Sequence, residues 1–368
     1  MIYFLFFMLA AQCYVMWRLW QLLPLPVGFK IVAMLAVVAL LALFVFALSP
    51  RVDKMPMPVA TAIYEVGTSF VIVLFYLFVL FLLMEAGRLL HLYPREFMHD
   101  SVEGTVFVFI VVTALLIYGN INYRHKRVVR LELQTSRARL RSASPVRMVM
   151  ASDLHLGYHN RRGELARWVD SINAERPDIV LLAGDIVDRS VRPLVDDSMA
   201  IELRRIKAPV FACLGNHEYY AGVDSCMHFF REAGIRLLRD EAVEWGGMLI
   251  VGRDDRTNRH RKSLQQLMQD KSQFSTFNFQ LPTIVLDHQP YNLEESEQCG
   301  VSFQLSGHTH HGQVWPASWL TDFLYECAHG PYQRGETQYY VSSGLGIWGG
   351  KFRIGTTSEY VVAELWTQ

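Results

Sequence analysis

The sequence predicts an α-helical transmembrane region followed by an α/β sandwich, and three observations lead to this fold class. Residues 1–123 contain long stretches without a charged side chain. From residue 146 onward, short apolar runs alternate with segments of helical periodicity. Histidine and carboxylate residues directly follow several of these runs. Length separates the two kinds of apolar segment, because a membrane-spanning helix is much longer than a buried strand.

The amino-terminal part contains four apolar stretches without charge. They are Met1–Trp17, Ile31–Pro50, Val66–Met84 and Gly104–Tyr123. Since a helix needs about 20 such residues to cross a bilayer, we expect four transmembrane helices in residues 1–123. A cleaved signal peptide is the alternative for the first stretch. We disfavour it because no Lys or Arg precedes Arg18 and three further apolar stretches follow.

Basic residues gather after the last of these stretches, where residues 124–145 are interpreted as a juxtamembrane linker. From 124 to 147 there are eight Lys or Arg residues and one acid, Glu132. Cytoplasmic flanks of membrane spans collect such residues. We therefore expect a multi-pass protein of a bacterial-type inner membrane or plasma membrane, with its carboxyl-terminal part in the cytoplasm. Four spans would place the amino terminus there too. The basic residues either are solvated or bind anionic lipid headgroups, and both readings stay open.

Overall charge and cysteine content exclude little but agree with this picture. The 35 basic residues balance 35 acidic ones, so nucleic acid is not an expected partner. Five scattered cysteines form no metal-binding pair and favour reduced thiols, as in cytoplasm. The sequence gives no indication of oligomeric state.

The carboxyl-terminal part contains short apolar runs that predict strands. They are Val146–Met150, Ile179–Ala183, Val210–Leu214, Met248–Gly252, Thr283–Leu286, Val301–Leu305, Tyr339–Ser342 and Tyr360–Leu365. Helical spacing of apolar residues predicts helices at Glu164–Asn173, Ser198–Ile206 and Asp224–Ala233. Alternation of strand and helix favours an α/β sandwich. Because ligands in such folds gather beyond the carboxyl ends of strands, the polar clusters there are expected to converge.

These clusters combine imidazole, carboxylate and amide groups without cysteine. In order, they are Asp153 and His155, Asp185, Asn216 with His217 and Glu218, His288, and His308 with His310. Such ligands suit divalent Mn, Fe or Zn. A cluster of this size predicts two metal ions, which would polarise phosphoryl oxygens and turn a bridging water into a nucleophile.

Five short motifs resemble, in order and spacing, those of calcineurin-like metallophosphoesterases. They are D-x-H at 153–155, G-D-x-x-D at 184–188, G-N-H-E at 215–218, a lone histidine at 288 and G-H-x-H at 307–310. Other strings resemble a membrane-associated branch that includes UDP-diacylglucosamine pyrophosphohydrolases and related phosphodiesterases. They are Leu286–Pro290, Gly307–Gln313 and Ser343–Gly346. His311 stands where this branch commonly has glycine, which makes positive φ more costly.

The resemblance implies a metal-dependent phosphoester hydrolase domain at 146–368, built from two mixed β-sheets flanked by helices. It implies one metal bound by Asp153, His155 and His310, and a second bound by Asn216, His288 and His308. Asp185 would bridge them, and His217 would protonate the departing oxygen. A structural role for His217 is the alternative. Mn is expected first, with Fe and Zn as alternatives. Glu218 and Asp188 are expected to orient ligands.

Location in a membrane favours a lipid-linked phosphodiester or pyrophosphate as substrate, with membrane lipids as partners. Nucleotide or cyclic-nucleotide hydrolysis is one alternative, and a membrane sensor or scaffold that only binds ligand is another. Two segments bear on this choice. Arg253–Lys262 either grips a second phosphate or is a solvated charge run. Trp315–Tyr325 either admits an acyl chain or packs in the core.

Overall fold

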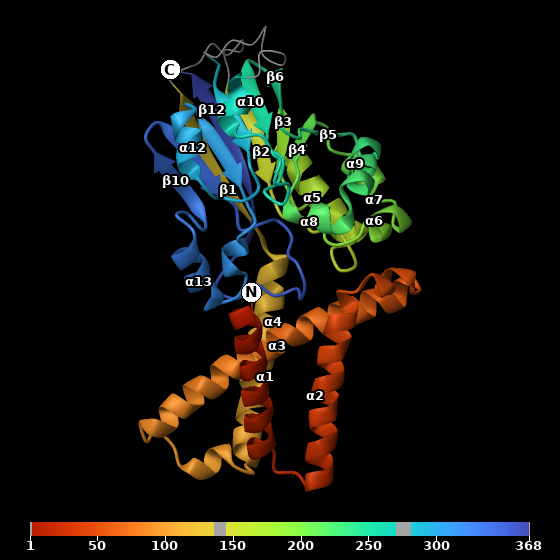
Figure 1. Ribbon diagram of the computed structural model, residues 1–368, viewed down its shortest axis with the longest axis vertical. Helices are drawn as coiled ribbons and strands as arrows, with labels where there is room; N and C mark the ends of the chain where they lie inside the picture. Colours follow the sequence, from red (N-terminus) through yellow and green to blue (C-terminus); the bar gives the residue numbers. More distant parts are fainter. Residues whose placement is uncertain (1, 136–144, 270–280, 368) are drawn as a thin grey trace. The chain divides into compact units, whose positions relative to one another are not determined.

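The computed structural model describes residues 2–135, 145–269 and 281–367, and its contacts divide the chain into two units (Figure 1). One unit is Met1–Ile121 together with Gly349–Phe352. The other is Asn122–Trp348 together with Arg353–Gln368. Each unit is described by itself.

The first unit is helical. Its elements are α1 (Ile2–Leu22), α2 (Val27–Ala47), η1 (Pro50–Lys54), α3 (Met57–Leu89), η2 (Arg95–Met98) and α4 (Val102–Arg124). Among the described residues, three helices are long and apolar enough to cross a membrane, namely α2, α3 and α4. The expected count of four is therefore one too many.

The stretch that was expected to be the first span falls in α1. Arg18 of that helix is buried and forms an ion pair with Glu85 of α3. Arg18 ends the uncharged stretch of α1 after Trp17, which leaves that stretch shorter than the roughly 20 residues that a spanning helix needs. The expected place of the amino terminus depended on four spans and is not retained.

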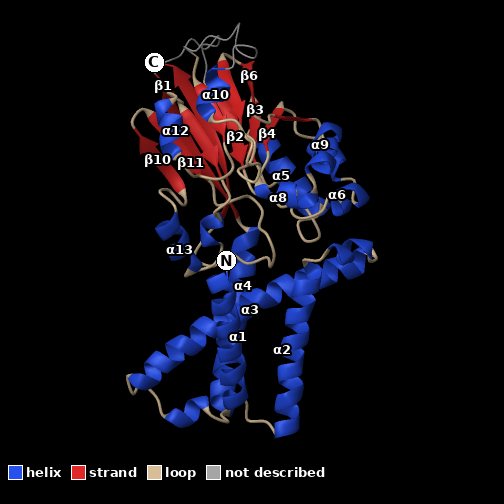
Figure 2. Cartoon of the chain, in the orientation of Figure 1, coloured by secondary structure: helices blue, strands red, loops and turns tan. Residues whose placement is uncertain are grey.

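The second unit holds two mixed β-sheets, as the sequence predicted (Figure 2). The first has the order β1 (Lys126–Thr135), β12 (Ser358–Thr367), β2 (Val146–Ala151), β3 (Ile179–Ala183), β4 (Val210–Cys213), β5 (Ile235–Leu237). The second has the order β10 (Gly330–Arg334), β11 (Thr337–Val341), β9 (Phe303–Ser306), β8 (Thr283–Leu286), β7 (Met248–Gly252), β6 (Glu241–Trp245). Strands β2 to β5 are parallel, as are β7, β8, β9 and β11. Every strand expected from the sequence is present.

Alternating side chains of the first sheet build two cores. Met148 and Met150 of β2 pack with the second sheet, in a cluster that includes Ile250. Val149 between them points to the other face. That face is covered by α5 (Arg162–Ala174), α7 (Met199–Leu203) and α9 (Val223–Glu232). Helix α5 contains the expected helix Glu164–Asn173, α9 matches the expected Asp224–Ala233 to within one residue at each end, and α7 is shorter than the expected Ser198–Ile206. On the far side of the second sheet, α10 (Leu264–Gln269) packs against β7.

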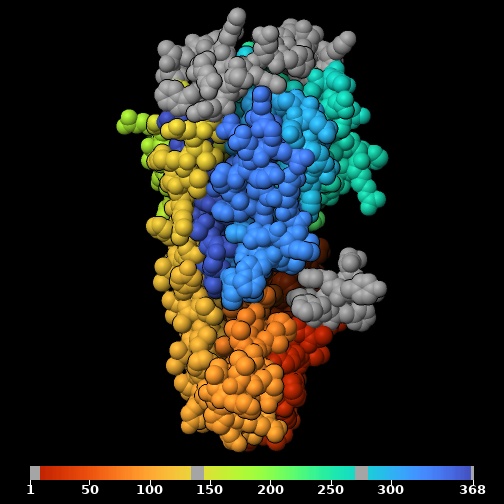
Figure 3. Space-filling view, turned by 90° about the vertical axis from the view of Figure 1, so that its left-hand side faces the viewer, coloured from red at the N-terminus to blue at the C-terminus, as the bar shows by residue number. Residues whose placement is uncertain are grey.

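Strand β1 lies in the segment that the sequence analysis treated as a linker. It pairs in parallel with β12 along its whole length, and the two run side by side in Figure 3. Val129 and Leu131 alternate with the exposed Arg130 and Glu132, which is a strand pattern that the dense basic charge masked. The short edge strands β5, β6 and β10 were also not expected.

Part of the basic run is engaged within the second unit. Arg130 pairs with Glu175 at 3.1 Å, and Arg147 pairs with Glu364 at 2.7 Å. Arg137, Arg139 and Arg141 lie outside the described residues. Two of the eight basic residues are thus ion-paired with the sheet domain and are not simply solvated.

Candidate metal centre

All of the predicted metal ligands lie just beyond the carboxyl ends of central strands. They are Asp153 and His155 after β2, Asp185 after β3, Asn216 after β4, His288 after β8, and His308 and His310 after β9. Parallel neighbours end at the same edge of a sheet, so residues that follow them are brought together. Both sheets contribute, and the structure gathers the ligands into buried groups that have the composition of metal sites.

The first group contains Asp153, His155 and His310. The Nε2 atoms of His155 and His310 are 3.0 Å apart, and Oδ1 of Asp153 lies 3.4 Å from Nε2 of His310. All three side chains are buried. Metal–nitrogen and metal–oxygen bonds measure about 2.1 Å, so adjacent ligands of one ion lie about 3 Å apart. The spacing of this group fits one divalent ion.

The second group contains Asp185, His288 and His308. Oδ2 of Asp185 lies 3.1 Å from Nε2 of His288 and 3.7 Å from Nε2 of His155. One carboxylate oxygen thus faces both groups, as a bridging ligand must. The amide oxygen of Asn216, the residue before His217, is buried and has no hydrogen-bond partner. Since an unpaired buried carbonyl is costly, this atom fits the role of a metal ligand.

Tautomers set by neighbouring groups aim lone pairs into the site. Nδ1 of His288 donates to the carbonyl oxygen of Ala183 at 2.7 Å, and a carbonyl can only accept. Nε2 of His288 is then unprotonated in the neutral ring, yet it faces the Asp185 carboxylate. Nδ1 of His155 likewise meets Oδ1 of Asp188 at 3.2 Å. Nε2 of His288 and Oδ2 of Asp185 both carry lone pairs at a separation of 3.1 Å, so a cation or a proton is required between them.

Electrostatics also call for positive charge at this place. Burial acts to lower the pKa of His155, but hydrogen bonds to Asp153 and Asp188 raise it to about 10. Burial lowers the pKa of His308 to about 4. Burial acts to raise the pKa of Asp185, but the positive charges of His288 and His217 bring it well below its usual range. The carboxylates thus stay negatively charged, and their charge favours protonation of some imidazoles. Divalent ions would supply this balancing positive charge in place of the protons.

Glu218 and Asp188 orient the ligand loops, as the sequence analysis expected. Glu218 is fully buried and accepts from the backbone N–H groups of Gly215 at 2.7 Å and Asp185 at 3.1 Å. It therefore ties the loop after β4 to the loop after β3. The carboxylate of Asp188 accepts a hydrogen bond from Nδ1 of His155. The backbone oxygen of Asp188 accepts one from Nδ1 of His217 at 2.8 Å.

His217 lies at the edge of the two groups and is partly exposed. Its backbone N–H donates to Oδ1 of Asp185 at 2.9 Å, and its ring packs edge-on against His155 at 4.5 Å. Because Nδ1 of His217 is hydrogen-bonded to the backbone oxygen of Asp188, Nε2 of His217 remains available to a substrate. His217 also forms a group of metal-site composition with His155 and Asp185. The geometry thus suits a proton donor and admits a ligand role.

The backbone at the site is strained. Left-handed φ values occur at five predicted ligands, namely Asp153 (53°), His155 (44°), Asp185 (50°), His308 (70°) and His310 (48°). His311 also takes φ 49°, at the position where glycine was expected. Such conformations cost about 1–3 kcal/mol each in residues with a side chain and persist at functional sites. The loops need glycine elsewhere, since a Cβ at Gly215 would lie 2.2 Å from Oδ1 of Asp185.

Arg353 is a residue of the site that sequence reasoning missed. It is fully buried, and Nη1 donates to the backbone oxygen of His310 at 2.7 Å. Nη2 donates to the backbone oxygens of Ser343 and Gly346. Arg353 therefore holds the loop of His310 against the loop that follows β11. No motif surrounds it in sequence, and only its place in the fold shows this role.

The basic segment Arg253–Lys262 is largely structural. Arg253 is buried and pairs with Asp287 at 3.0 Å and with Glu295 at 2.8 Å. Arg261 pairs with Asp287 at 3.1 Å. These two arginines are therefore unavailable to a substrate. Arg256 lies over the ring of Tyr291 instead.

The aromatic segment Trp315–Tyr325 forms α13 (Ala317–Leu324) and does not pack in the core. Phe323 is 85% exposed and Trp319 is 65% exposed, and Leu320 and Leu324 are exposed beside them. The expectation of ordinary core packing is wrong for these four side chains. A helix with so many exposed apolar residues presents a surface suited to a partner or a lipid phase.

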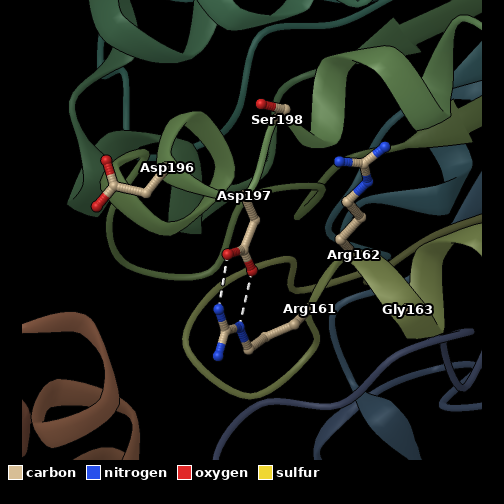
Figure 4. A pocket seen from close by; sticks show the side chains of 6 residues that line it. All are labelled: Arg161, Arg162, Gly163, Asp196, Asp197 and Ser198. Atoms are coloured by element: carbon tan, nitrogen blue, oxygen red, sulfur yellow. Dashed lines mark hydrogen bonds and ion pairs between the residues drawn. The ribbon is translucent and has the colours of Figure 1, made fainter.

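A separate cavity lies at the start of α5. It measures about 550 Å³ and is lined by Arg161, Arg162, Gly163, Asp196, Asp197 and Ser198 (Figure 4). Arg161 forks onto Asp197 at 2.6 and 2.7 Å, and Arg162 pairs with Glu202 at 2.9 Å. None of the predicted metal ligands lines it. Because both arginines are already neutralised, we assign no ligand to this cavity.

Comparison with known proteins decides the family. A calcineurin-like phosphoesterase profile matches residues 146–312. A transmembrane protein with metallophosphoesterase domain from Danio rerio is 30% identical over 307 residues, covering 79% of this chain and 70% of the relative. The chain belongs to the calcineurin-like phosphoesterase family. The groups of metal-site composition in this chain are in keeping with that family, which uses a dinuclear metal site.

Two further proteins are similar to this chain over part of its length. An uncharacterized metallophosphoesterase of Helicobacter pylori is 33% identical over 224 residues, which cover 60% of each chain. The chain thus spans about 60% of the length of that relative. The 5'-nucleotidase precursor of Thermus thermophilus shares 16% identity over 60% of this chain and 55% of its own, with a TM-score of 0.37. The three apolar helices and the Danio rerio relative indicate a membrane protein.

Proposed function

We propose that this metallophosphoesterase hydrolyses a phosphodiester or pyrophosphate bond on a lipid-linked substrate at a two-metal site. The observation that carries the two-metal part is the position of Asp185, whose Oδ2 faces both ligand groups. Two divalent ions would supply Lewis acidity to the phosphoryl oxygens and activate water. Mn is our first choice, with Fe and Zn as alternatives, because the ligands are imidazole, carboxylate and amide oxygen.

The residues divide their roles as follows. Asp153, His155 and His310 would hold one ion, and Asn216, His288 and His308 the other, with Asp185 between them. His217 keeps Nε2 available because Nδ1 donates to the backbone of Asp188. In this position it holds a proton for the departing oxygen. Burial acts to lower the pKa of His217, but the nearby Asp185 raises it, which favours the protonated form.

The lipid part of the proposal is supported by α13 and by the short tether. Helix α4 ends at Arg124 and β1 begins at Lys126, so a single residue joins the last apolar helix to the sheet domain. Its reach is only about 3.5 Å. Trp319 and Phe323 of α13 are exposed. Aromatic and aliphatic side chains on one helix face are suited to the membrane interface.

We further propose that the catalytic domain at 146–368 faces the cytoplasm of a bacterial-type inner membrane or plasma membrane. The basic run after Tyr123 favours this side, and the five cysteines are free. Residues 1–123 would anchor the chain, and the segment 124–145 would contribute β1 to the domain. A fluorescent reporter fused after Gln368 should be active. Activity of alkaline phosphatase at that position, without fluorescence, would reverse the orientation.

The decisive assay measures hydrolysis by the detergent-purified chain with Mn against matched lipid and nucleotide phosphoesters. We expect turnover of at least one lipid phosphodiester or pyrophosphate to exceed that of soluble and cyclic nucleotides. Faster cleavage of nucleotides than of every lipid would favour the nucleotide alternative. Binding of phosphoesters without turnover of any of them would favour a sensor or scaffold, which the complete ligand set argues against.

A further inference from the structure

Arg256 is a cation without a carboxylate partner among the described residues, and two tyrosine rings lie between it and His308. It lies in the loop after β7 and is partly exposed. Its guanidinium carbon lies 4.9 Å from the centre of the Tyr291 ring. Among the described residues, Tyr291 is the group that Arg256 contacts through its charge. Arg256 thus differs from Arg253 and Arg261 of the same segment, which are neutralised by Asp287.

The acids next to Arg256 are engaged elsewhere. Asp254 accepts from the hydroxyl of Tyr219 at 2.6 Å and from Nε of Arg239 at 2.8 Å. Asp255 accepts from the backbone N–H of Thr257 at 2.8 Å and from Nε2 of Gln289 at 2.9 Å. The folded loop therefore leaves the charge of Arg256 available. The hydrogen bond that Gln289 donates to Asp255 also fixes this loop to the one that carries His288.

Aromatic rings connect Arg256 to the metal ligands. The hydroxyls of Tyr291 and Tyr325 are 3.0 Å apart, and their ring centres are 4.9 Å apart. The ring of Tyr325 meets the ring of His308 edge-on at 6.4 Å. Arg256, Tyr291 and Tyr325 thus form a row that begins at His308. We call these three residues the Arg256 cluster.

We propose that the Arg256 cluster binds a second phosphate group of the substrate, beyond the phosphate that is cleaved. A guanidinium stacked on a ring keeps its planar N–H donors free at the edge, where they match phosphate oxygens. The two tyrosine hydroxyls add polar contacts on the side of His308. A nucleobase fits less well, because Arg256 already covers one face of Tyr291. The inference rests on phosphoester hydrolysis at the metal centre, but not on a lipid substrate.

Three soluble substrates of the detergent-purified full-length chain test this proposal. The first is thymidine 5'-(4-nitrophenyl phosphate), which has one phosphate. The second carries an additional 3'-phosphate, and the third is the 4-nitrophenyl ester of thymidine 5'-diphosphate. All products are separated by chromatography, and kcat and KM are determined for each substrate. We expect the wild type to prefer one of the two substrates with a second phosphate. The preferred substrate shows whether the bound phosphate is remote from the cleaved phosphate or directly linked to it.

The substitution Arg256→Gln should lower kcat/KM on the preferred substrate by about 10- to 100-fold relative to the one-phosphate substrate, mainly through KM. Arg256→Lys should recover part of the preference, since it keeps the charge but not the planar fork. Arg259→Gln is the matched control, because it removes the same charge from an exposed position of the same loop. It should leave the preference unchanged.

Two outcomes would overturn the inference. One is a wild type without preference for either substrate that carries a second phosphate. The other is an equal fall on all three substrates in Arg256→Gln, with unchanged thermal unfolding. In both cases hydrolysis of the one-phosphate substrate would still support the metal centre. Absence of hydrolysis of every phosphoester, lipids included, would instead refute the proposed function.

Discussion

The Nε2 atoms of His155 and His310 lie 3.0 Å apart although 155 residues separate them in sequence. His155 follows a strand of the first sheet, and His310 follows a strand of the second. Asp188 holds Nδ1 of His155, so the Nε2 lone pairs converge. An ion at this point would bind the edges of both sheets together, and the metal content of the chain is therefore a direct test of the site.

We predict close to two divalent ions per folded chain, measured by elemental analysis after growth with Mn. His155→Ala should remove the ion of the first group and leave about one. Asp185→Asn should lower occupancy of both, because Oδ2 of Asp185 faces both groups. His260→Ala, at an exposed position outside the site, is the control. A folded wild type with one ion or none would contradict the two-metal assignment.

His217→Ala should keep both ions and lower kcat by about 10²- to 10⁴-fold, the usual contribution of a positioned general acid. The physical reason is that Nε2 of His217 is left for the substrate while Nδ1 donates to Asp188. His228→Ala removes an exposed histidine elsewhere and should have little effect. If His217→Ala lost an ion and regained activity at high Mn, His217 would be a ligand and not the acid.

Arg353, which no sequence motif revealed, should prove necessary to the site, and Arg353→Met should destabilise the loop of His310. The change removes donors from the buried backbone oxygens of His310 and Gly346. Leaving a buried acceptor unpaired costs about 1–3 kcal/mol. We expect a lower Tm in thermal unfolding and weaker Mn binding in calorimetric titration. Arg162→Met, in a pair near the surface, should change neither. Unchanged Mn affinity in Arg353→Met would mean that the His310 loop holds its shape without this arginine.

Changing Trp319 and Phe323 of α13 to serine should impair hydrolysis of a substrate embedded in the bilayer. These are the most exposed side chains of the segment, so the fold should survive and a small chromogenic phosphodiester should still be cleaved. The chain is assayed in nanodiscs that contain the lipid substrate. Val195 and Ile201, exposed on other helices, are changed to serine as a matched control. Equal loss on both substrates would assign α13 to packing, and equal retention would remove it from lipid access.

The sequence by itself determined the inner strands of both sheets and the chemistry at their ends. Both are local properties. A buried strand such as β3 is a short apolar run, and a predicted ligand such as Asp185 follows it closely. Parallel neighbours end at one edge of a sheet, so the approach of His155 to Asp185, which follow β2 and β3, was expected from order along the chain. Residue type then favoured divalent Mn, Fe or Zn, without a choice among them.

Only the tertiary structure decided features that depend on distant partners. Strand β1 becomes part of a sheet because β12, near the other end of the domain, lies beside it. Arg253 and Arg256 look alike in sequence, yet Asp287 neutralises the first and a tyrosine ring receives the second. Trp319 could have packed in the core, and its exposure is set by the position of α13 in the folded domain. Burial and pairing are properties of whole surfaces in contact, and local periodicity does not contain them.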